Sequence, residues 1–219
     1  MSSSQYDFWL LDLDGTLVDV DPQYIHEVFD GVGRRLGLSF SDREGELLWY
    51  GIGDARDGLL AEHGIDPEHF WDVFHSVEEP KNRAAATHLY DDAELFVPDI
   101  DEPVGVVTHC QEYLTGPVLE ALDIEDWFDT VVCCTDETGW KPDPGPVELA
   151  MTDLGVAHNG HTGVLVGDDP RDVGAAHNAG LSSVHVRRRS YEHLLPDGGN
   201  TGPSVDADQR IGSLTDLDG

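Results

Sequence analysis

The amino-acid sequence predicts an α/β fold in which a parallel sheet carries one long helical insert. Two observations indicate this fold. Short apolar runs alternate with helix-like segments after residue 90, as in sheets whose parallel strands are joined by helices. One further apolar run, residues 6–11, stands alone near the start, because residues 18–87 have the pattern of helices and contain no recognisable strand.

The elements before residue 90 follow from local signals. Residues 6–11 form a continuous apolar run, which is typical of a parallel strand buried on both faces. Asp21-Pro22 and Asp66-Pro67 each place a capping acid before a proline, so a helix is expected to start at each pair. Shorter helices are expected over residues 46–50 and 55–63.

The elements after residue 90 give the rest of the sheet. Apolar runs predict strands over residues 104–108, 130–134, 164–167 and 183–186. Helices are predicted over residues 112–122, 144–154 and 170–178, with a short closing element over residues 210–217. We therefore expect a core domain of residues 1–17 and 88–219 and a helical domain of residues 18–87. The insert leaves from the carboxyl end of the first strand, where open α/β sheets bind ligands.

The charge of the chain is extreme. It has 44 acidic residues against 12 Lys and Arg, a formal net charge of -32, and its only lysines are Lys81 and Lys141. Such a surface repels nucleic acid and anionic membranes, and acids spread along the whole chain are typical of proteins from cells that keep molar salt inside. No apolar run approaches the ~20 residues that span a bilayer, and the start lacks the pattern of a signal peptide. We expect a halophilic, cytoplasmic protein without nucleic-acid or membrane partners. The basic run of residues 187–189 is interpreted as local surface charge balance.

Chemically active side chains follow four of the predicted strands, so they are expected at one edge of the sheet. They are Asp12, Asp14, Thr108, Lys141, Asp168 and Asp172. Clustered carboxylates suit Mg²⁺. A lysine, a hydroxyl group and a glycine (Gly15) that allows close backbone approach complete a site for a phosphoryl group. An aspartate there can attack phosphorus, and a second acid can move the protons.

These motifs resemble those of a known family. Residues 12–18, Thr108, Lys141-Pro142 and the segment 167–172 are similar to the four ordered motifs of the haloacid dehalogenase-like hydrolase superfamily. The resemblance covers essentially the whole chain, and residues 141–144 and 175–180 are typical of its phosphoglycolate phosphatase-like branch. It implies a doubly wound, Rossmann-like core with an inserted all-helical cap.

The resemblance also implies a role for each motif residue. Asp12 would be the nucleophile and a magnesium ligand, while Asp14 would be the general acid and base and give its backbone carbonyl to the metal. Lys141 would neutralise the phosphoryl charge and orient Asp12. Thr108 and the backbone N–H of His109 would hold phosphate oxygens. The remaining two acids, Asp168 as a metal ligand and Asp172 through metal water or Lys141, would complete the metal site.

The sequence departs from the family pattern in three places. His109 stands where the branch usually has Asn. Asp169 stands where a small hydroxyl residue is common, and it can be either a site group or an acid at the start of a helix. The segment 91–103 is short and acidic, so the long helix that usually precedes the second motif is expected to be missing.

The predicted activity is magnesium-dependent hydrolysis of a small phosphate monoester, such as phosphoglycolate or a sugar phosphate, through an aspartyl-phosphate. A phosphomutase of the same family is the main alternative. Haloacid dehalogenation is disfavoured because that branch typically lacks the second acid, here Asp14, and a phospho-acceptor signalling module is disfavoured by chain length and spacing. Specificity is assigned to the helical domain, with Tyr24, residues 51–53 and Arg56 as candidates. Both a monomer and a homodimer are compatible with the sequence.

Overall fold

The computed structural model describes residues 5–51, 55–157, 160–188 and 206–217. Over these residues the chain folds into two compact units. The first comprises residues 5–19, 88–188 and 206–217, and the second comprises residues 20–87. The chain passes from one unit to the other through two short strands, β2 (Val18–Val20) and β3 (Thr87–Leu89), which pair with each other.

The first unit is built on a six-stranded sheet in the order β5-β4-β1-β6-β7-β8, and the five strand pairs are parallel. The strands are β1 (Phe8–Leu11), β4 (Val104–Thr108), β5 (Thr130–Cys133), β6 (Gly163–Gly167), β7 (Ser182–Val186) and β8 (Gln209–Ile211). The order reverses direction around β1, which lies between β4 and β6. The carboxyl end of β1 is therefore at the switch point of the sheet, the usual place for a ligand in this architecture.

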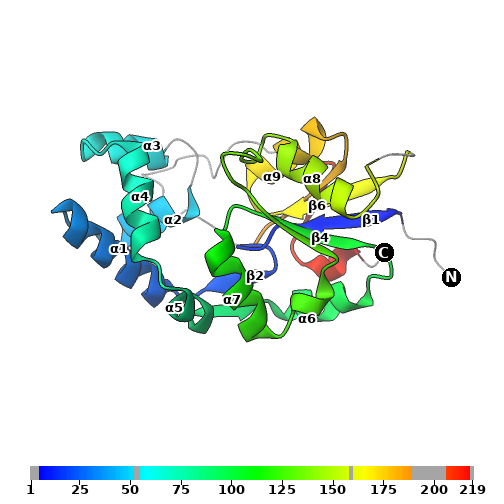
Figure 1. Cartoon of the computed structure of the whole chain (residues 1–219), viewed down its shortest axis with the longest axis horizontal. Helices are drawn as coiled ribbons and strands as arrows, with labels where there is room; N and C mark the ends of the chain where they lie inside the picture. The colour runs from blue at the N-terminus through cyan, green and yellow to red at the C-terminus, as the bar shows by residue number, and fades with distance from the viewer. Residues whose placement is uncertain (1–4, 52–54, 158–159, 189–205, 218–219) are drawn as a thin grey trace. The chain divides into compact units, whose positions relative to one another are not determined.

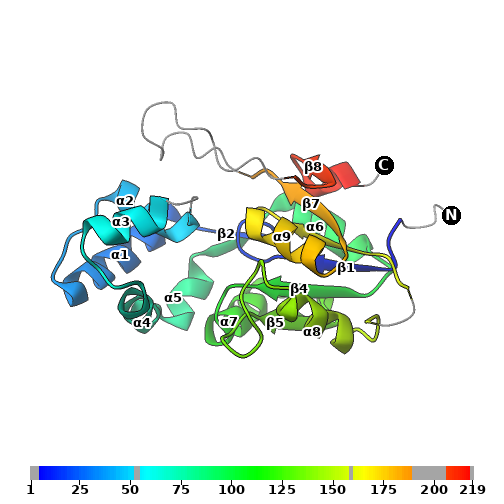
Figure 2. The same ribbon diagram turned by 90° about the horizontal axis from the view of Figure 1, so that it is seen from above.

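Both faces of this sheet are covered. Alternate residues of β1 point to opposite sides, so that Phe8 and Leu10 enter one apolar cluster while Trp9 and Leu11 enter another. The first cluster is completed by α8 (Gly145–Asp153) and α9 (Pro170–Asn178). The second is completed by α6 (Asp91–Phe96), α7 (Glu112–Leu122) and the short helices η1 (Val97–Asp99) and η3 (Leu214–Leu217). Figure 1 shows α8 and α9 on one side of the sheet and α6 and α7 on the other, and Figure 2 shows the same layers from above.

The second unit is helical. It consists of α1 (Pro22–Leu36), α2 (Asp42–Tyr50), α3 (Ala55–Glu62), α4 (Pro67–Val77) and α5 (Pro80–Ala85), packed around a core rich in Phe. Proline occupies the first turn of α1, as the sequence predicts, and Asp66 accepts a hydrogen bond from the backbone N–H of His69 at the start of α4. Ser41 and Glu44 form a reciprocal capping box at the start of α2.

The predicted fold class, an α/β sheet core with an inserted helical unit, is confirmed. The prediction that residues 18–87 contain no strand is wrong at both ends of this segment, where β2 and β3 form. Three residues are too few to show the alternation that identifies a strand. The segment 91–103 contains only the short helices α6 and η1, in line with the predicted absence of a long helix. Among the described helices, none has the length and apolar content needed to span a membrane.

Candidate active site

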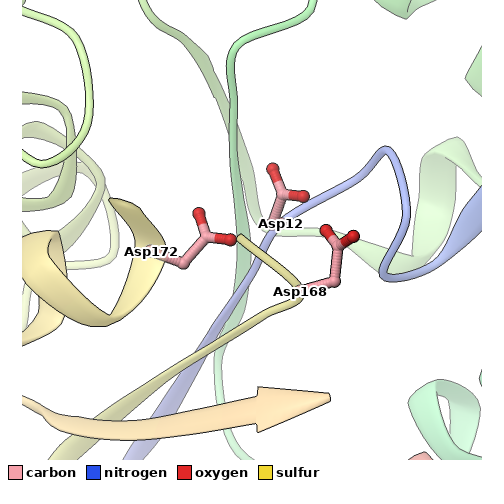
Figure 3. Close-up of side chains that lie close together, drawn as sticks. All are labelled: Asp12, Asp168 and Asp172. Atoms are coloured by element: carbon pink, nitrogen blue, oxygen red, sulfur yellow. The ribbon is translucent and has the colours of Figure 1, made fainter. Parts of the chain in front are cut away.

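Asp12 follows directly after β1, the strand at the centre of the sheet. Its backbone N–H donates to the carbonyl of Val166 on β6 (2.9 Å), so the residue is held as a continuation of the sheet. Its side chain is buried. The carboxylates of Asp12, Asp168 and Asp172 approach one another in Figure 3, the first from the loop after β1 and the other two from the segment that joins β6 to α9. The strand order thus brings together acids that are 160 residues apart in the sequence (172 − 12).

Lys141 provides the positive charge of this cluster. Its Nζ atom lies 2.7 Å from Asp12 Oδ1 and 2.6 Å from Asp172 Oδ1, and it donates to the carbonyl of Val107 at 2.9 Å. The side chain is almost fully buried, with 2% exposed. The ammonium group therefore donates hydrogen bonds to Asp12 and Val107 and forms an ion pair with Asp172. The side-chain amide of Asn178 on α9 donates to the carbonyl of Pro142 (2.9 Å) and fixes the loop that carries the lysine.

Asp168 and Asp172 lie after β6, in the loop and in the first turn of α9. Together with Asp12 they offer carboxylate oxygens that all lie within 4.8 Å of one another. Gly15 makes room for this arrangement. An ideal Cβ atom at Gly15 would lie 2.6 Å from Asp168 Cγ, and the residue has a φ of +81°. Only glycine meets both conditions without strain.

Asp169 has a structural role in α9. It is the N-cap of the helix and forms a reciprocal capping box with Asp172, whose Oδ2 accepts from the Asp169 N–H at 3.0 Å. It also forms an ion pair with Arg171. Burial alone would raise the pKa of Asp169, but the hydrogen bonds and the charge of Arg171 lower it below its usual value. Of the two roles open in the sequence, the structure supports that of an acid at a helix start.

Burial dominates the electrostatics of the three clustered acids. It raises the pKa of Asp12 to about 7, with Lys141 acting in the opposite direction and Asp172 and Asp14 adding to the rise. Burial and the charges of Asp12 and Asp172 raise the pKa of Asp168 well above its usual value. For Lys141, burial alone would lower the pKa, but the charges of Asp12 and Asp172 raise it above its ordinary value, so it is charged at any physiological pH.

The charge balance of the cluster fits a divalent cation. Three carboxylates and one ammonium group give a formal charge of -2 (−3 + 1). Within the described ranges no basic side chain forms an ion pair with the Asp168 carboxylate, while Lys141 already serves the other two acids. Clustered carboxylate oxygens are hard ligands of the kind that Mg²⁺ prefers.

The other predicted core residues lie at the same edge of the sheet. Thr108 ends β4 and is buried, and its Oγ1 accepts from the backbone N–H of Cys110 at 3.0 Å. The ring of His109 packs against Trp140 with ring centres 5.7 Å apart. Asp14 is half-buried in the turn after β1, where it forms a β-bridge with Val18.

The predicted specificity residues belong to the helical unit. Arg56 lies in α3, with its guanidinium 5.2 Å from the centre of the Trp71 ring and its Nε 3.8 Å from Asp57 Oδ1. The hydroxyl of Tyr24 donates to Glu78 at 3.3 Å. Gly51 ends α2 in a left-handed conformation, and residues 52–53 lie outside the described residues. Their proposed contact with substrate stays a prediction.

Three residues to which the sequence analysis assigned no role at the site support the cluster. Thr16 is fully buried and donates from Oγ1 to Asp12 Oδ2 at 3.4 Å. His185 on β7 places Nε2 2.9 Å from the carbonyl oxygen of Asp168. Arg188 contacts the carbonyl of Thr16 and is buried, so the interpretation of the run 187–189 as surface charge is wrong at this position. A threonine four residues after the first acid was the only available signal for any of the three.

A second cluster on the core unit has the composition of a serine hydrolase triad but not its geometry. Ser183 Oγ lies 2.8 Å from His177 Nε2 and 2.9 Å from Asp208 Oδ2. The same Nε2 atom lies 3.3 Å from Asp208, whereas a triad uses the two ring nitrogens for its two partners. These residues join α9, β7 and the segment before β8.

The fold and the site define an α/β enzyme of the phosphoryl-transfer type, with its acids and lysine at the switch point of a parallel sheet. Residues 9–186 match the family model described as haloacid dehalogenase-like hydrolase. The chain is 29% identical over 180 residues to the pyrophosphatase PpaX of Oceanobacillus iheyensis, covering 81% of each chain. It is 29% identical over 213 residues to the N-acetylmuramic acid 6-phosphate phosphatase of Pseudomonas putida, covering 92% of each.

Solved structures share this fold. The structure of a predicted phosphoglycolate phosphatase from Haemophilus somnus superposes with a TM-score of 0.73 at 19% identity, covering 98% of this chain and 97% of the other. The protein belongs to the haloacid dehalogenase-like hydrolase family. The predictions that it falls in the phosphoglycolate phosphatase-like branch and is a phosphoric monoester hydrolase are confirmed.

Proposed function

We propose that the protein hydrolyses a small phosphate monoester with Mg²⁺ as its cofactor, through an aspartyl-phosphate formed on Asp12. The observation that best supports this proposal is the buried ammonium group of Lys141, 2.7 Å from Asp12 and 2.6 Å from Asp172. Its charge favours the ionised form of Asp12 and so opposes the effect of burial, which raises the pKa of this acid. An ionised carboxylate is what nucleophilic attack requires.

In the first half of the reaction, a carboxylate oxygen of Asp12 attacks phosphorus and the ester oxygen leaves. Asp14 gives this oxygen its proton. Lys141, the Thr108 hydroxyl and the His109 N–H stabilise the charge on the phosphoryl oxygens. The Mg²⁺ ion, held by Asp12, the Asp14 carbonyl and Asp168, would supply charge compensation and orient the phosphoryl group. Asp172 holds Lys141 in place and adds to the charge around the metal.

In the second half, Asp14 takes a proton from water, which attacks the phosphorus of the aspartyl-phosphate. Phosphate is released and Asp12 returns as a carboxylate. Asp14 suits this double use, since it is half-buried in the turn beside the nucleophile. A group that alternates between acid and base must be able to reach both the leaving oxygen and the incoming water.

The substrate is proposed to be selected by the helical unit of residues 18–87 acting as a cap, with Arg56 as a candidate contact. The names of the relatives give the compounds to try first: pyrophosphate, N-acetylmuramic acid 6-phosphate and phosphoglycolate. Sugar phosphates extend the panel. We further propose that the enzyme works in a cytoplasm of high salt, as its charge of -32 favours.

The test is phosphate release from this panel in molar KCl with MgCl₂. Wild type, Asp12→Asn and Asp14→Asn are compared with Asp126→Asn, which changes an exposed acid of the short helix η2 (Glu125–Trp127). We expect both site variants to lose activity, Asp126→Asn to retain it, and EDTA to abolish it reversibly. Equal release by wild type and Asp12→Asn would refute the proposal.

The same experiment separates the alternatives. An isomerised phosphate ester without free phosphate would identify a mutase. Halide release from a 2-haloacid would identify a dehalogenase. Stoichiometric phosphorylation of the protein without turnover would identify a signalling module.

A further inference from the structure

Arg188 follows β7 and is the middle residue of the basic run 187–189. Its side chain is 7% exposed, whereas its neighbour Arg187 is exposed. A buried guanidinium group is costly unless its donors have partners. The structure supplies acceptors for Nη1 and Nη2, whereas the buried Nε has no hydrogen-bond partner among the described residues.

The guanidinium group bridges two acceptors. Nη1 donates to Asp92 Oδ2 and Nη2 donates to the carbonyl oxygen of Thr16, both at 2.6 Å. The guanidinium carbon lies 4.2 Å from the centre of the Tyr90 ring, within the range of a cation–π contact. The planar fork of an arginine can satisfy both acceptors at once, whereas the ammonium group of a lysine is a point charge on a flexible stem.

Asp92 is a fixed anchor for this fork. It lies in the first turn of α6, and its Oδ2 also accepts from Ser213 Oγ at 2.8 Å and from the backbone N–H of Leu214 at 2.7 Å. Burial alone would raise the pKa of Asp92, but the hydrogen bonds from Arg188, Leu214 and Ser213 lower it below its usual value. The anchor is therefore ionised and held from three sides.

The second hydrogen bond of the guanidinium group, from Nη2 to the Thr16 carbonyl, holds the loop that carries the catalytic acids. Thr16 lies two residues after Asp14 and donates from its side chain to Asp12 Oδ2 at 3.4 Å. The loop also places Gly15 against Asp168, with no room for a Cβ atom. A displacement of the Thr16 backbone would therefore move the acid/base residue, the nucleophile and the wall of the metal site together.

We propose that Arg188 is a positioning residue, which holds the Asp14–Thr16 loop in its catalytic geometry by joining the Thr16 carbonyl to Asp92. This inference rests on the proposed function of Asp12 and Asp14. A misplacement of reacting groups by about 1 Å costs on the order of 100-fold in rate. The expected effect of losing Arg188 is thus a fall in kcat, with KM changed far less because Thr108 and Lys141 still bind phosphate.

The test compares Arg188→Ala with Arg188→Lys, and uses Arg187→Ala as the matched control. Hydrolysis of p-nitrophenyl phosphate is measured in molar KCl with MgCl₂, and circular dichroism checks that each variant is folded. We expect Arg188→Ala to lose about 10- to 100-fold in kcat, Arg188→Lys to lose less, and Arg187→Ala to match wild type. Millimolar guanidinium chloride should restore activity to Arg188→Ala and not change Arg187→Ala, because free guanidinium can replace the missing group.

A folded Arg188→Ala with the kcat of Arg187→Ala would overturn the inference, as would a loss confined to KM or a loss that guanidinium does not repair. If Arg188→Ala fails to fold, Arg188→Lys decides: a lower kcat at unchanged KM supports the inference, and full kcat overturns it. A wild-type protein without phosphatase activity would overturn the proposed function and this inference with it. An active wild type with an unaffected Arg188→Ala overturns the inference alone.

Discussion

Asp12→Asn is expected to stabilise the protein in the absence of metal while it abolishes activity. The three clustered acids share one ammonium group, so the site carries a formal charge of -2. Asparagine at position 12 removes one of these charges, keeps nearly the same shape and still offers an oxygen to Lys141. The folded protein therefore gains stability from the loss of a functional charge, a trade-off common at active sites.

The size of the effect follows from the pKa of Asp12. Burial raises this pKa from 3.8 to about 7, which at 1.36 kcal/mol per pH unit corresponds to an ionisation cost of up to about 4 kcal/mol in the folded state. The cost is absent below the unfolded pKa, grows as the pH rises and is complete above the folded pKa. If Asp12→Asn removes half of this ionisation cost, Tm rises by at least ~4 °C for a chain of this size.

The assay is thermal unfolding in EDTA and molar KCl, at pH 5 and at pH 8, with Asp126→Asn as the control. We expect Asp12→Asn to exceed wild type in Tm by more at pH 8 than at pH 5, and Asp126→Asn to follow wild type at both. Added MgCl₂ should narrow the difference, because it stabilises wild type more. A variant that melts at or below the wild-type temperature at pH 8 would refute the electrostatic reasoning.

Three further predictions concern Lys141, Gly15 and the net charge of the chain. Lys141→Met should lower kcat by at least about 100-fold, measured against Lys81→Met, which changes the other lysine, an exposed residue of α5; equal activities would contradict the role of Lys141. Gly15→Ala should cost about 1 kcal/mol or more in stability, measured by denaturant unfolding, because of its positive φ and the proximity of Asp168. Gly116→Ala in α7, where a Cβ atom has open space, should cost nothing, and equal effects would argue against the close approach. Dialysis to low salt should remove structure because it lengthens the Debye length from ~3 Å and exposes the charge of -32 to self-repulsion; an unchanged circular dichroism spectrum would contradict the halophilic character.

Most of the sheet could be predicted from the sequence. Its inner strands are buried on both faces and therefore read as continuous apolar runs, as in β4 and β6. The helices α7 and α9 begin and end where the pattern predicts. The short strands β2 and β3 and the helix α5 could not be predicted, because their pairing and packing come from tertiary contacts rather than from a periodic pattern.

The acids of the site could be named from the sequence because each follows a strand, and parallel strands end at one edge of the sheet. The contacts that hold these acids in place could not be predicted from the sequence. Arg188 lies in a run of arginines that reads as surface charge, and only the fold brings it to Thr16 and Asp92. Asp169 illustrates the opposite case, since a capping acid and a metal ligand have the same sequence pattern after a strand.

The proposed mechanism requires that Asp12 forms a covalent bond to phosphorus. The most direct test is rapid quenching of the enzyme during turnover of its best substrate, followed by borohydride reduction and peptide mass spectrometry. An acyl phosphate is reduced to an alcohol, so we expect homoserine in place of aspartate at position 12 and at no other acid. A wild-type enzyme that turns over its substrate and shows reduction at a different residue, or at none, would contradict it.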